Sequence, residues 1–448
     1  MKKILLSIFL FTCFAIQAQY SIKGTIDPDH DYSWILLYKM VNGDQTYVAN
    51  ADVIEGQFTF EIEDSEPVGI YRAYYQIENN LYVEFIYNKE EIEFSFDPNS
   101  PDSSIAFSRS KENNVYQNYY REIKLQQQKI DSIQVLYFKS TDKDQDSELV
   151  DQYQKNLKEL KEIQQNFEKE SNDMLAHHFI RASAQYNAEE PHKEPVDYML
   201  AIKAHFFDYM DLSDEVLNHS TFVIDRLHDY VFYLNQADDL NSENEYQKIA
   251  IEKSLKWIGN DFELLSNFEE DLLEAYLFNE NVEMINFVNE NYYKSLPDAL
   301  QSRELNERIS GTLKTAIGTK AADFSWQSEG ISNSLHTLTG TDYYIVLFFS
   351  SNCPHCQMEI PEFYKFITGI ENIKVVAIGL EDEKKSWELM TKEYTEFINI
   401  LDLDKWSSQK VVDYGVNAIP TYFVLDSDKR ILAKPEDFNE LKSLFETK

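Results

Sequence analysis

The chain has 448 residues, of which 43% are hydrophobic and 14% aromatic, so it is not a disordered chain. That length accommodates about three domains. Its 78 acidic residues outnumber 41 basic ones, which leaves a formal net charge of −37. Because nucleic acids and anionic membrane surfaces are bound by clustered positive charge, we expect neither as a partner.

Residues 1–18 have the pattern of a cleaved signal peptide. Lys2 and Lys3 form a positive start, an apolar stretch runs from Ile4 to Ile16, and Ala18 is a small residue at the cleavage point. The apolar stretch is short for a membrane span, which needs about 20 apolar residues, and no later segment is long enough either. We therefore predict an exported, periplasmic protein without a membrane span in its mature form.

The same segment permits a second interpretation, a lipoprotein acylated on Cys13. Phe11 and Thr12 fit this poorly, because lipid-modification signals carry small residues before the cysteine. If the segment is cleaved, Cys353 and Cys356 are the remaining thiols of the chain. Disulfides persist in exported compartments, yet this chain has no cysteines to spare for structural bridges. Cysteine is therefore expected to serve chemistry here.

Residues 19–108 predict a small antiparallel β-sandwich. Segments rich in β-branched and aromatic residues are separated by turn clusters such as Asp97-Pro98-Asn99. Polar and apolar residues alternate, which is typical of strands with one buried face. The predicted strands are residues 20–26, 34–39, 57–62, 69–77, 81–87 and 91–96.

Residues 109–312 predict an all-α middle region, because glycine and proline almost disappear there. Apolar residues recur three or four positions apart, as on one face of a helix, at Tyr153, Leu157, Leu160, Ile163 and Phe167. Such amphipathic helices need partners, either each other or a neighbouring domain. Further helices are expected at residues 222–234, 245–258, 262–278 and 282–293.

Residues 313–448 predict an α/β domain with a central sheet. Strands are expected at residues 343–349 and 373–380, with a helix after each, followed by a hairpin and a closing helix. The predicted later elements are a helix at 386–397, hairpin strands at 422–425 and 430–433, and a helix at 438–445. The whole chain is thus predicted to be a multidomain α+β protein.

The tetrapeptide Cys353-Pro354-His355-Cys356 directly follows the first of these strands. Two cysteines three positions apart at the start of a helix can close a small disulfide and reopen it. The helix N-terminus lowers the pKa of the first thiol, and the thiolate is the attacking species. The motif therefore indicates thiol–disulfide exchange.

The motif, with Ile419-Pro420-Thr421 directly before a later strand, resembles the active site of the thioredoxin fold. Residues 313–448 are similar to the TlpA-type and ResA-type disulfide reductases of bacterial envelopes. The lead-in at residues 318–324, Phe348-Phe349-Ser350 and Pro361 also match. The sandwich and helical regions resemble uncharacterised segments that precede such domains in some envelope proteins.

The resemblance implies roles for individual residues. Cys353 would be the exposed nucleophile and Cys356 the buried resolving thiol of a redox-active disulfide. Pro420 would be a cis-proline facing the disulfide. The backbone of Ile419 would then hydrogen-bond an extended substrate strand beside the thiols.

Pro354 and His355 would contact substrate and set the redox poise. This pair is found in strongly oxidising DsbA-like proteins, at roughly −120 mV against roughly −270 mV for thioredoxin. Ile419, in contrast, resembles the residue before the cis-proline in thioredoxin-like reductants. We expect a reduction potential between these two values, and the net direction of electron flow stays open.

Glu359 lies three residues after Cys356 on the same helix face and matches a cavity glutamate of ResA-like reductases. A buried carboxylate there would have a raised pKa and could take the proton of Cys356. The alternative is an exposed surface residue. Two departures from the family are Asn352, which replaces a common tryptophan and could cap the helix, and Leu347, which replaces thioredoxin's buried acid.

The function predicted is that of an exported thiol–disulfide oxidoreductase that acts on protein thiols and disulfides of the envelope, with an unidentified redox partner and no cofactor. One alternative is an envelope scaffold protein in which the first two regions bind a partner. A weaker one is a peroxiredoxin-like peroxidase, although the Pro-x-x-x-Thr-x-x-Cys signature is missing before Cys353. No metal site is expected, because one C-x-x-C and His355 do not complete a zinc site.

Overall fold

The computed structural model describes residues 19–28, 32–41, 43–218, 220–328 and 330–446. The predicted signal peptide, with Cys13, lies outside the described residues. The chain divides into two compact units, one ending at Phe268 and the other running from Glu269 onward, so the boundary falls within helix α9 (Phe262–Phe278). Among the described residues, no helix is long and apolar enough to cross a membrane.

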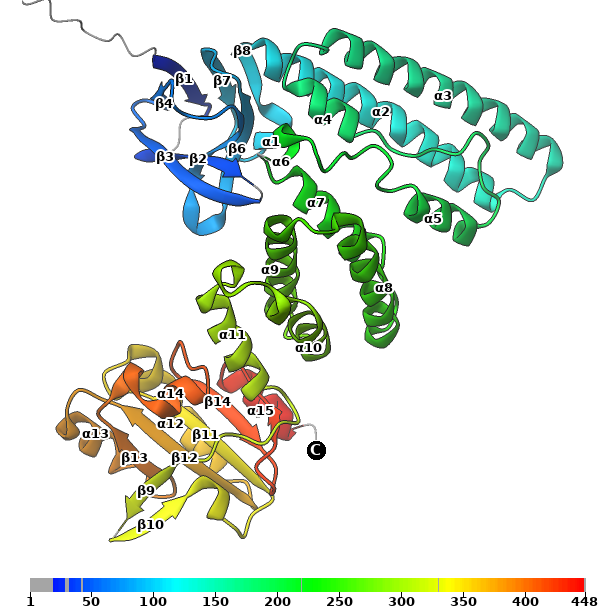
Figure 1. The fold of residues 1–448 in the computed structure, drawn as a ribbon. Coiled ribbons are helices and arrows are strands. Elements are labelled where there is room, and N and C mark those ends of the chain that lie inside the picture. Colours follow the sequence, from blue (N-terminus) through cyan, green and yellow to red (C-terminus); the bar gives the residue numbers. More distant parts are fainter. Residues whose placement is uncertain (1–18, 29–31, 42, 219, 329, 447–448) are drawn as a thin grey trace, which may run out of the picture. The chain divides into compact units, whose positions relative to one another are not determined.

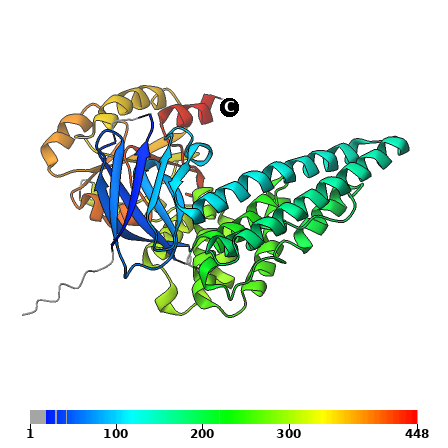
Figure 2. The ribbon, with the colours of Figure 1, turned by 90° about the horizontal axis from the view of Figure 1, so that it is seen from above.

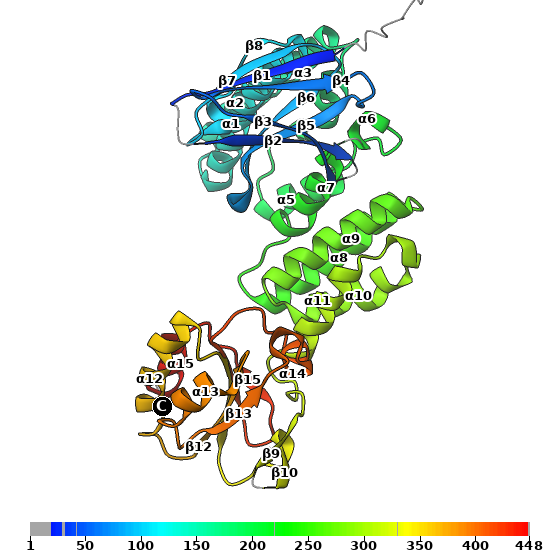
Figure 3. The same ribbon diagram turned by 90° about the vertical axis from the view of Figure 1, so that its left-hand side faces the viewer.

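The first unit begins with a β-sandwich of two four-stranded sheets, which Figure 3 shows one above the other. One sheet has the order β4-β1-β7-β8 and the other the order β3-β2-β5-β6. All pairs are antiparallel except β1 and β7, which run parallel and are separated in the chain by five other strands. The strands are β1 (Gln19–Ile26), β2 (Trp34–Val41), β3 (Asp44–Asp52), β4 (Gln57–Glu63), β5 (Gly69–Gln76), β6 (Leu81–Tyr87), β7 (Ile92–Phe96) and β8 (Ala106–Arg109).

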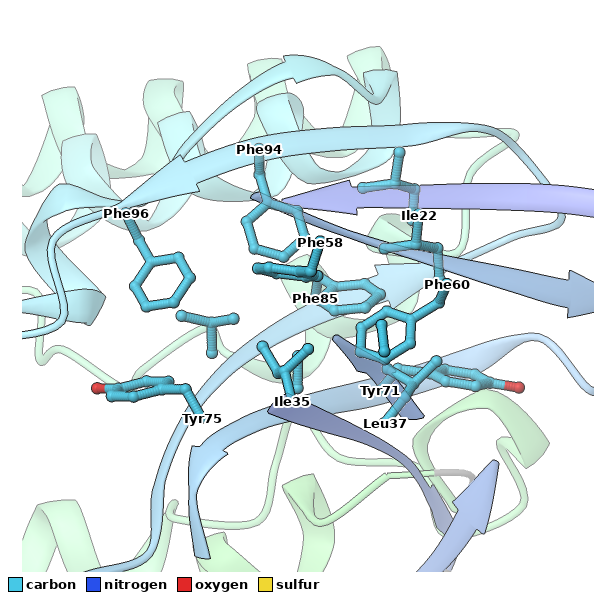
Figure 4. Packing of buried hydrophobic residues seen from close by; sticks show 14 of the residues in the cluster. Ile22, Ile35, Leu37, Phe58, Phe60, Tyr71, Tyr75, Phe85, Phe94 and Phe96 are labelled. Atoms are coloured by element: carbon cyan, nitrogen blue, oxygen red, sulfur yellow. The ribbon is translucent and has the colours of Figure 1, made fainter. Parts of the chain in front are cut away.

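Aromatic side chains from both sheets fill the space between them (Figure 4). Phe58 and Phe60 of β4 and Phe94 of β7 are buried, while their neighbours along each strand are exposed, as the alternation in the sequence predicts. Gly24 in β1 makes room for this packing, since a Cβ atom there would lie 1.9 Å from the ring of Phe58.

Two of these strands, β3 and β8, were not predicted from the sequence. Both lie at sheet edges, where one side of the strand has no neighbour. β3 contains few β-branched or aromatic residues, and β8 has four residues. A strand with little buried surface shows little alternation, so its pattern is weak.

Two long helices, α2 (Lys111–Lys139) and α3 (Lys143–Glu170), follow the sandwich and lie side by side as a hairpin (Figure 2). Tyr153, Leu157 and Leu160 of the predicted apolar face of α3 pack in one cluster with Ile130 and Ile133 of α2. The predicted helix at 222–234 is α7 followed by a π-helical turn at Asp229–Tyr233. The other helices of this unit are α1 (Pro101–Ser104), α4 (Ala176–Ala182), α5 (Pro195–Ala204), α6 (Glu215–Asn218), α7 (Phe222–His228) and α8 (Leu240–Ile258).

In the second unit, α10 (Val282–Asn291) and α11 (Arg303–Lys314) lead into a five-stranded sheet (Figure 1). The order is β13-β12-β11-β14-β15, with the first three strands parallel and the last two antiparallel to their neighbours. The strands are β11 (Tyr343–Phe349), β12 (Ile373–Leu380), β13 (Ile398–Asp402), β14 (Thr421–Leu425) and β15 (Ile431–Ala433), and β9 (Ser325–Ser328) and β10 (Ile331–Ser334) form a separate hairpin.

Helices cover both faces of this sheet. Ile345, Leu347 and Phe349 of β11 pack toward α12 (Pro354–Ile367) and α15 (Phe438–Glu446). Tyr344, Val346 and Phe348 face the opposite side, with residues of α14 (Gln409–Asp413). Successive side chains of β11 point to opposite faces of the sheet, and both faces are covered by helices. Almost every residue of this central strand is therefore buried and apolar.

The helix predicted at residues 386–397 is shorter than expected, and a strand follows it. α13 (Lys384–Thr391) ends early, and β13 forms the edge of the sheet. β13 was missed because its five residues come directly after the predicted helix and two of them are polar. This strand matters for the site, because its end lies at the same sheet edge as the end of β12.

Candidate active site

Cys353 lies at the junction between β11 and α12. The strand ends at Phe349, and Cys353 is the N-cap residue of the helix, so its thiol lies at the positive end of the helix dipole. The thiol is partly exposed and donates to the carbonyl oxygen of Ile419 at 3.6 Å. Its backbone N–H donates to the carbonyl of Ser350 at 3.2 Å. Cys353 is thus accessible, and its position is fixed by the start of α12 and by the hydrogen bond to Ile419.

Cys356 lies one helical turn further and is fully buried. Burial raises the pKa of this thiol strongly, and the charges of Cys353 and Glu359 raise it further, against an opposing backbone hydrogen bond from Ser350. Both thiols are free in this structure. The two cysteines therefore differ in accessibility, and burial makes the Cys356 thiol hard to ionise.

The segment before β14 lies beside the motif. β14 pairs antiparallel with β11, with Thr421 opposite Phe348, so the start of one strand meets the end of the other. The Ile419–Pro420 peptide bond is cis, the conformation implied by the resemblance. Ile419 and Pro420 are both half-buried. Their predicted roles toward a substrate stay predictions.

Glu359 is half-buried and held by two hydrogen bonds. Its Oε1 accepts from the hydroxyl of Tyr422 at 2.8 Å and from the backbone N–H of Phe438, at the start of α15, at 2.9 Å. Burial, and then this hydrogen bond, raises the pKa of Tyr422, so the phenol stays a proton donor. Glu359 is therefore fixed toward the interior near Cys356, and it is not a freely exposed surface residue.

Pro354 and His355 are both exposed at the first turn of α12. They are accessible to a substrate, and their contact with one remains a prediction. The expectation that Asn352 caps this helix was wrong, because Cys353 is the N-cap residue. The side chain of Asn352 instead donates to Glu381 at 3.4 Å.

Sequence reasoning missed Glu381, which directly follows β12 and is fully buried. Its carboxylate accepts hydrogen bonds from the loop before Cys353, namely from Ser350, Ser351 and Asn352. The sequence held one indication, an acidic residue at the end of an apolar strand. The carboxyl ends of parallel neighbouring strands share one sheet edge, which places this residue next to the motif.

Several solved structures are similar to this chain. A thioredoxin-like protein from Bacteroides caccae is 21% identical, covers 59% of this chain and 98% of its own, and has a TM-score of 0.41. The thioredoxin domain of a thiol-disulfide oxidoreductase from Bacteroides vulgatus is 20% identical, with 30% and 96% covered and a TM-score of 0.27. A thiol:disulfide interchange protein from Bacteroides sp. is 20% identical, with 30% and 90% covered and a TM-score of 0.27.

No curated protein matches the chain. Two family models do match it. Residues 340–431 match a family described as thioredoxin-like, and residues 20–116 match a domain of unknown function (DUF4369). The C-terminal part of the chain is thus a thioredoxin-like domain, as the sequence predicted, and the N-terminal sandwich is an uncharacterised domain. The thioredoxin-like domain supports a redox role.

Proposed function

We propose that this protein is an exported thiol–disulfide oxidoreductase that reduces or exchanges disulfides of envelope proteins through Cys353 and Cys356. The observation that carries the proposal is the asymmetry of the two thiols. Cys353 is partly exposed at a helix N-terminus, and Cys356 is buried one turn inside. That arrangement separates the attacking thiol from the resolving one.

In the reducing direction, the thiolate of Cys353 attacks one sulfur of a substrate disulfide. A bond forms between the two sulfurs, the substrate disulfide breaks, and one substrate thiolate leaves. Cys356 then loses its proton and attacks Cys353, which closes the Cys353–Cys356 disulfide and releases the second substrate thiolate. Two electrons pass to the substrate, and a dithiol protein of the envelope would return them. The same steps in reverse oxidise a dithiol.

The substrate would bind as an extended strand. The backbone of Ile419 lies beside the Cys353 thiol, as their hydrogen bond indicates. A peptide that pairs with this backbone would place its own disulfide against Cys353, as in recognition by β-strand addition. Exposed Pro354 and His355, at the first turn of α12, would border the peptide next to the thiol.

Trapping of mixed disulfides tests the assignment. Cys356→Ser should accumulate covalent complexes with substrate proteins, because Cys353 attacks and nothing resolves the bond. Cys353→Ser should not, since Cys356 is buried. Non-reducing gels of both variants, expressed with the export segment in place, would show the difference. Equal trapping by both variants, or by neither, would contradict the proposed roles.

A second candidate, an envelope scaffold, is favoured by a groove of about 720 Å³ in the first unit. The groove lies among α2, α3 and residues 183–187, with Tyr120, Lys124 and Arg226 in its walls. A double variant, Cys353→Ser with Cys356→Ser, separates the two candidates. A partner retained by this full-length variant would favour the scaffold, whereas loss of all partners would favour exchange chemistry.

A further inference from the structure

The loop that presents Cys353, residues Ser350 to Asn352, is held by a single carboxylate from the neighbouring strand. β11 and β12 pair in parallel register, with Phe349 opposite Gly379, so both strands end at the same edge of the sheet. Glu381 follows the end of β12 and has no exposed surface. Its own backbone N–H donates to the carbonyl of Asp402 at 3.0 Å, at the end of the adjacent strand β13.

The carboxylate of Glu381 receives four hydrogen bonds from three consecutive residues. Ser351 donates through both its backbone N–H and its hydroxyl, the latter at 2.9 Å. The Ser350 hydroxyl donates at 3.3 Å and the Asn352 amide at 3.4 Å. All four donors are neutral, so the negative charge of Glu381 is solvated by this loop and not cancelled by a cation in these contacts.

Two of these residues, Ser350 and Ser351, also hydrogen-bond the cysteine motif and its helix. The carbonyl of Ser350 accepts from the backbone N–H of Cys353, and the carbonyl of Ser351 accepts from the side chain of Gln357 at 2.7 Å. Movement of the loop would therefore move the start of α12. A charged acceptor makes hydrogen bonds roughly twice as strong as neutral ones, so the loop is fixed firmly.

The charge of Glu381 also acts on the thiols. The carboxylate has no exposed surface, and it accepts from the side chain of Asn352, the residue next to Cys353. A nearby negative charge disfavours a thiolate, and a less stable thiolate makes the reduced form of a dithiol a better electron donor. The effect opposes the helix dipole at Cys353, which favours the thiolate.

We propose that Glu381 is a positioning residue, which holds the loop before Cys353 in the orientation for attack and whose fixed charge keeps the Cys353–Cys356 pair on the reducing side. This inference rests on the proposed redox function. Leu347 of β11 occupies the place of thioredoxin's buried acid. In this chain the buried carboxylate near the motif is that of Glu381, which follows β12.

The reduction potential tests the charge. Wild type and Glu381→Gln would be equilibrated with glutathione redox buffers at pH 7, and the fraction of disulfide measured by alkylation and mass spectrometry. The glutamine side chain keeps the size and loses the charge, so the equilibrium should shift at least tenfold toward the dithiol, which corresponds to about 30 mV. Glu362→Gln, an exposed change on the same helix as the cysteines, is the matched control and should leave the equilibrium unchanged.

Two further variants keep the test decisive. Glu381→Asp retains the charge and should stay within about threefold of the wild-type equilibrium constant, whereas a shift as large as that of Glu381→Gln would show that charge is not the cause. If Glu381→Gln does not fold, Ser351→Ala carries the test of positioning. It removes one donor, and the rate of attack on a model disulfide should fall at least threefold, so an unchanged rate would overturn the positioning role.

The outcomes also separate this inference from the proposed function. If the wild-type protein does not equilibrate with glutathione at all, the redox function itself fails. If the wild type equilibrates and a folded Glu381→Gln gives the same constant, only the role of Glu381 is wrong.

Discussion

Glu359 and Cys356 share one face of α12, and the carboxylate is held by Tyr422 and the N–H of Phe438. At the scale of single residues, Glu359 is the carboxylate closest in sequence to the buried thiol. Its charge contributes to the raised pKa of Cys356. It would therefore hold Cys356 as a thiol in the resting reduced state and accept the proton when Cys356 attacks.

Glu359→Gln should therefore lower the pKa of Cys356 and shift the pH profile of the resolving step toward lower pH. The measurement is the rate of resolution of a preformed mixed disulfide on Cys353, followed from pH 5 to 9. Glu362→Gln, one turn along and exposed, provides the control. Superimposable profiles for Glu359→Gln and wild type would remove Glu359 from the mechanism.

Glu269 is a second residue with an unusual environment, within the second unit. Its side chain is 3% exposed, its Oε2 has no hydrogen-bond partner among the residues that the structure describes, and burial raises its pKa to about 8. At neutral pH the folded protein thus holds a proton on Glu269 that the unfolded chain, with a pKa near 4.5, has lost. The free energy of unfolding that this bound proton contributes is fully present below pH 4.5 and is lost as the pH rises toward 8.

Glu269→Gln should remove this dependence, because the amide is neutral at every pH. We expect the variant to be more stable than wild type at pH 7, by on the order of 2–3 kcal/mol, with little difference at pH 4. Urea unfolding at both pH values measures this, and Glu304→Gln on the exposed side of α11 is the control. A constant difference across the pH range would contradict the assignment.

At the scale of elements, the edge strand β13 is fastened to α14 by an ion pair. The Lys410 ammonium lies 2.8 Å from Oδ2 of Asp402, and the Ser408 hydroxyl donates to the same oxygen at 2.6 Å. Burial alone would raise the pKa of Asp402, but the Lys410 and Ser408 hydrogen bonds outweigh it and lower the pKa. The ion pair therefore stabilises the fold at pH values above the ordinary pKa of an aspartate. That contribution is lost as the pH falls through the lowered pKa of Asp402.

Lys410→Met should leave a buried carboxylate without its cation and cost about 2–3 kcal/mol at pH 7. The deficit should shrink in acid, where Asp402 becomes protonated in both proteins. Lys405→Met removes a cation from Asp382, which is largely exposed, and should cost less than about 1 kcal/mol. Thermal unfolding of both variants at pH 7 and pH 3 compares them, and equal losses would show that the Lys410 pair is not special.

At the scale of the whole molecule, the proposed function depends on export, because disulfide substrates persist outside the reducing cytoplasm. Protein isolated from its native host should begin near Gln19, after removal of residues 1–18. N-terminal sequencing of the mature protein checks this directly. An intact Met1 would contradict export by this signal, and a lipid on Cys13 would establish the lipoprotein alternative.

Much of the architecture could be predicted from local pattern. The bounds of β6, β11, β12 and α9 agree with the predicted segments, because each is a long or strongly apolar element whose periodicity depends on its own residues. The edge strands β3, β8 and β13 could not be predicted in this way, since polar residues or short length leave each of them with a weak pattern of its own. The predicted boundaries after residues 108 and 312 stay predictions.

The sequence by itself determined the candidate thiol pair, because Cys353 and Cys356 belong to one contiguous motif whose spacing suffices to close a disulfide. Only the tertiary structure decided what surrounds it. Tyr422 reaches Glu359 from β14, and Glu381 reaches Ser351 from the end of β12. These contacts join residues far apart in the chain. The Glu381 contact exists because the parallel strands β11 and β12 end at the same edge of the sheet, and Tyr422 lies near that edge because β14 starts there, antiparallel to β11. A local sequence pattern contains no information on which strands become neighbours, so Tyr422 and Glu381 could not be identified as parts of the site from the sequence.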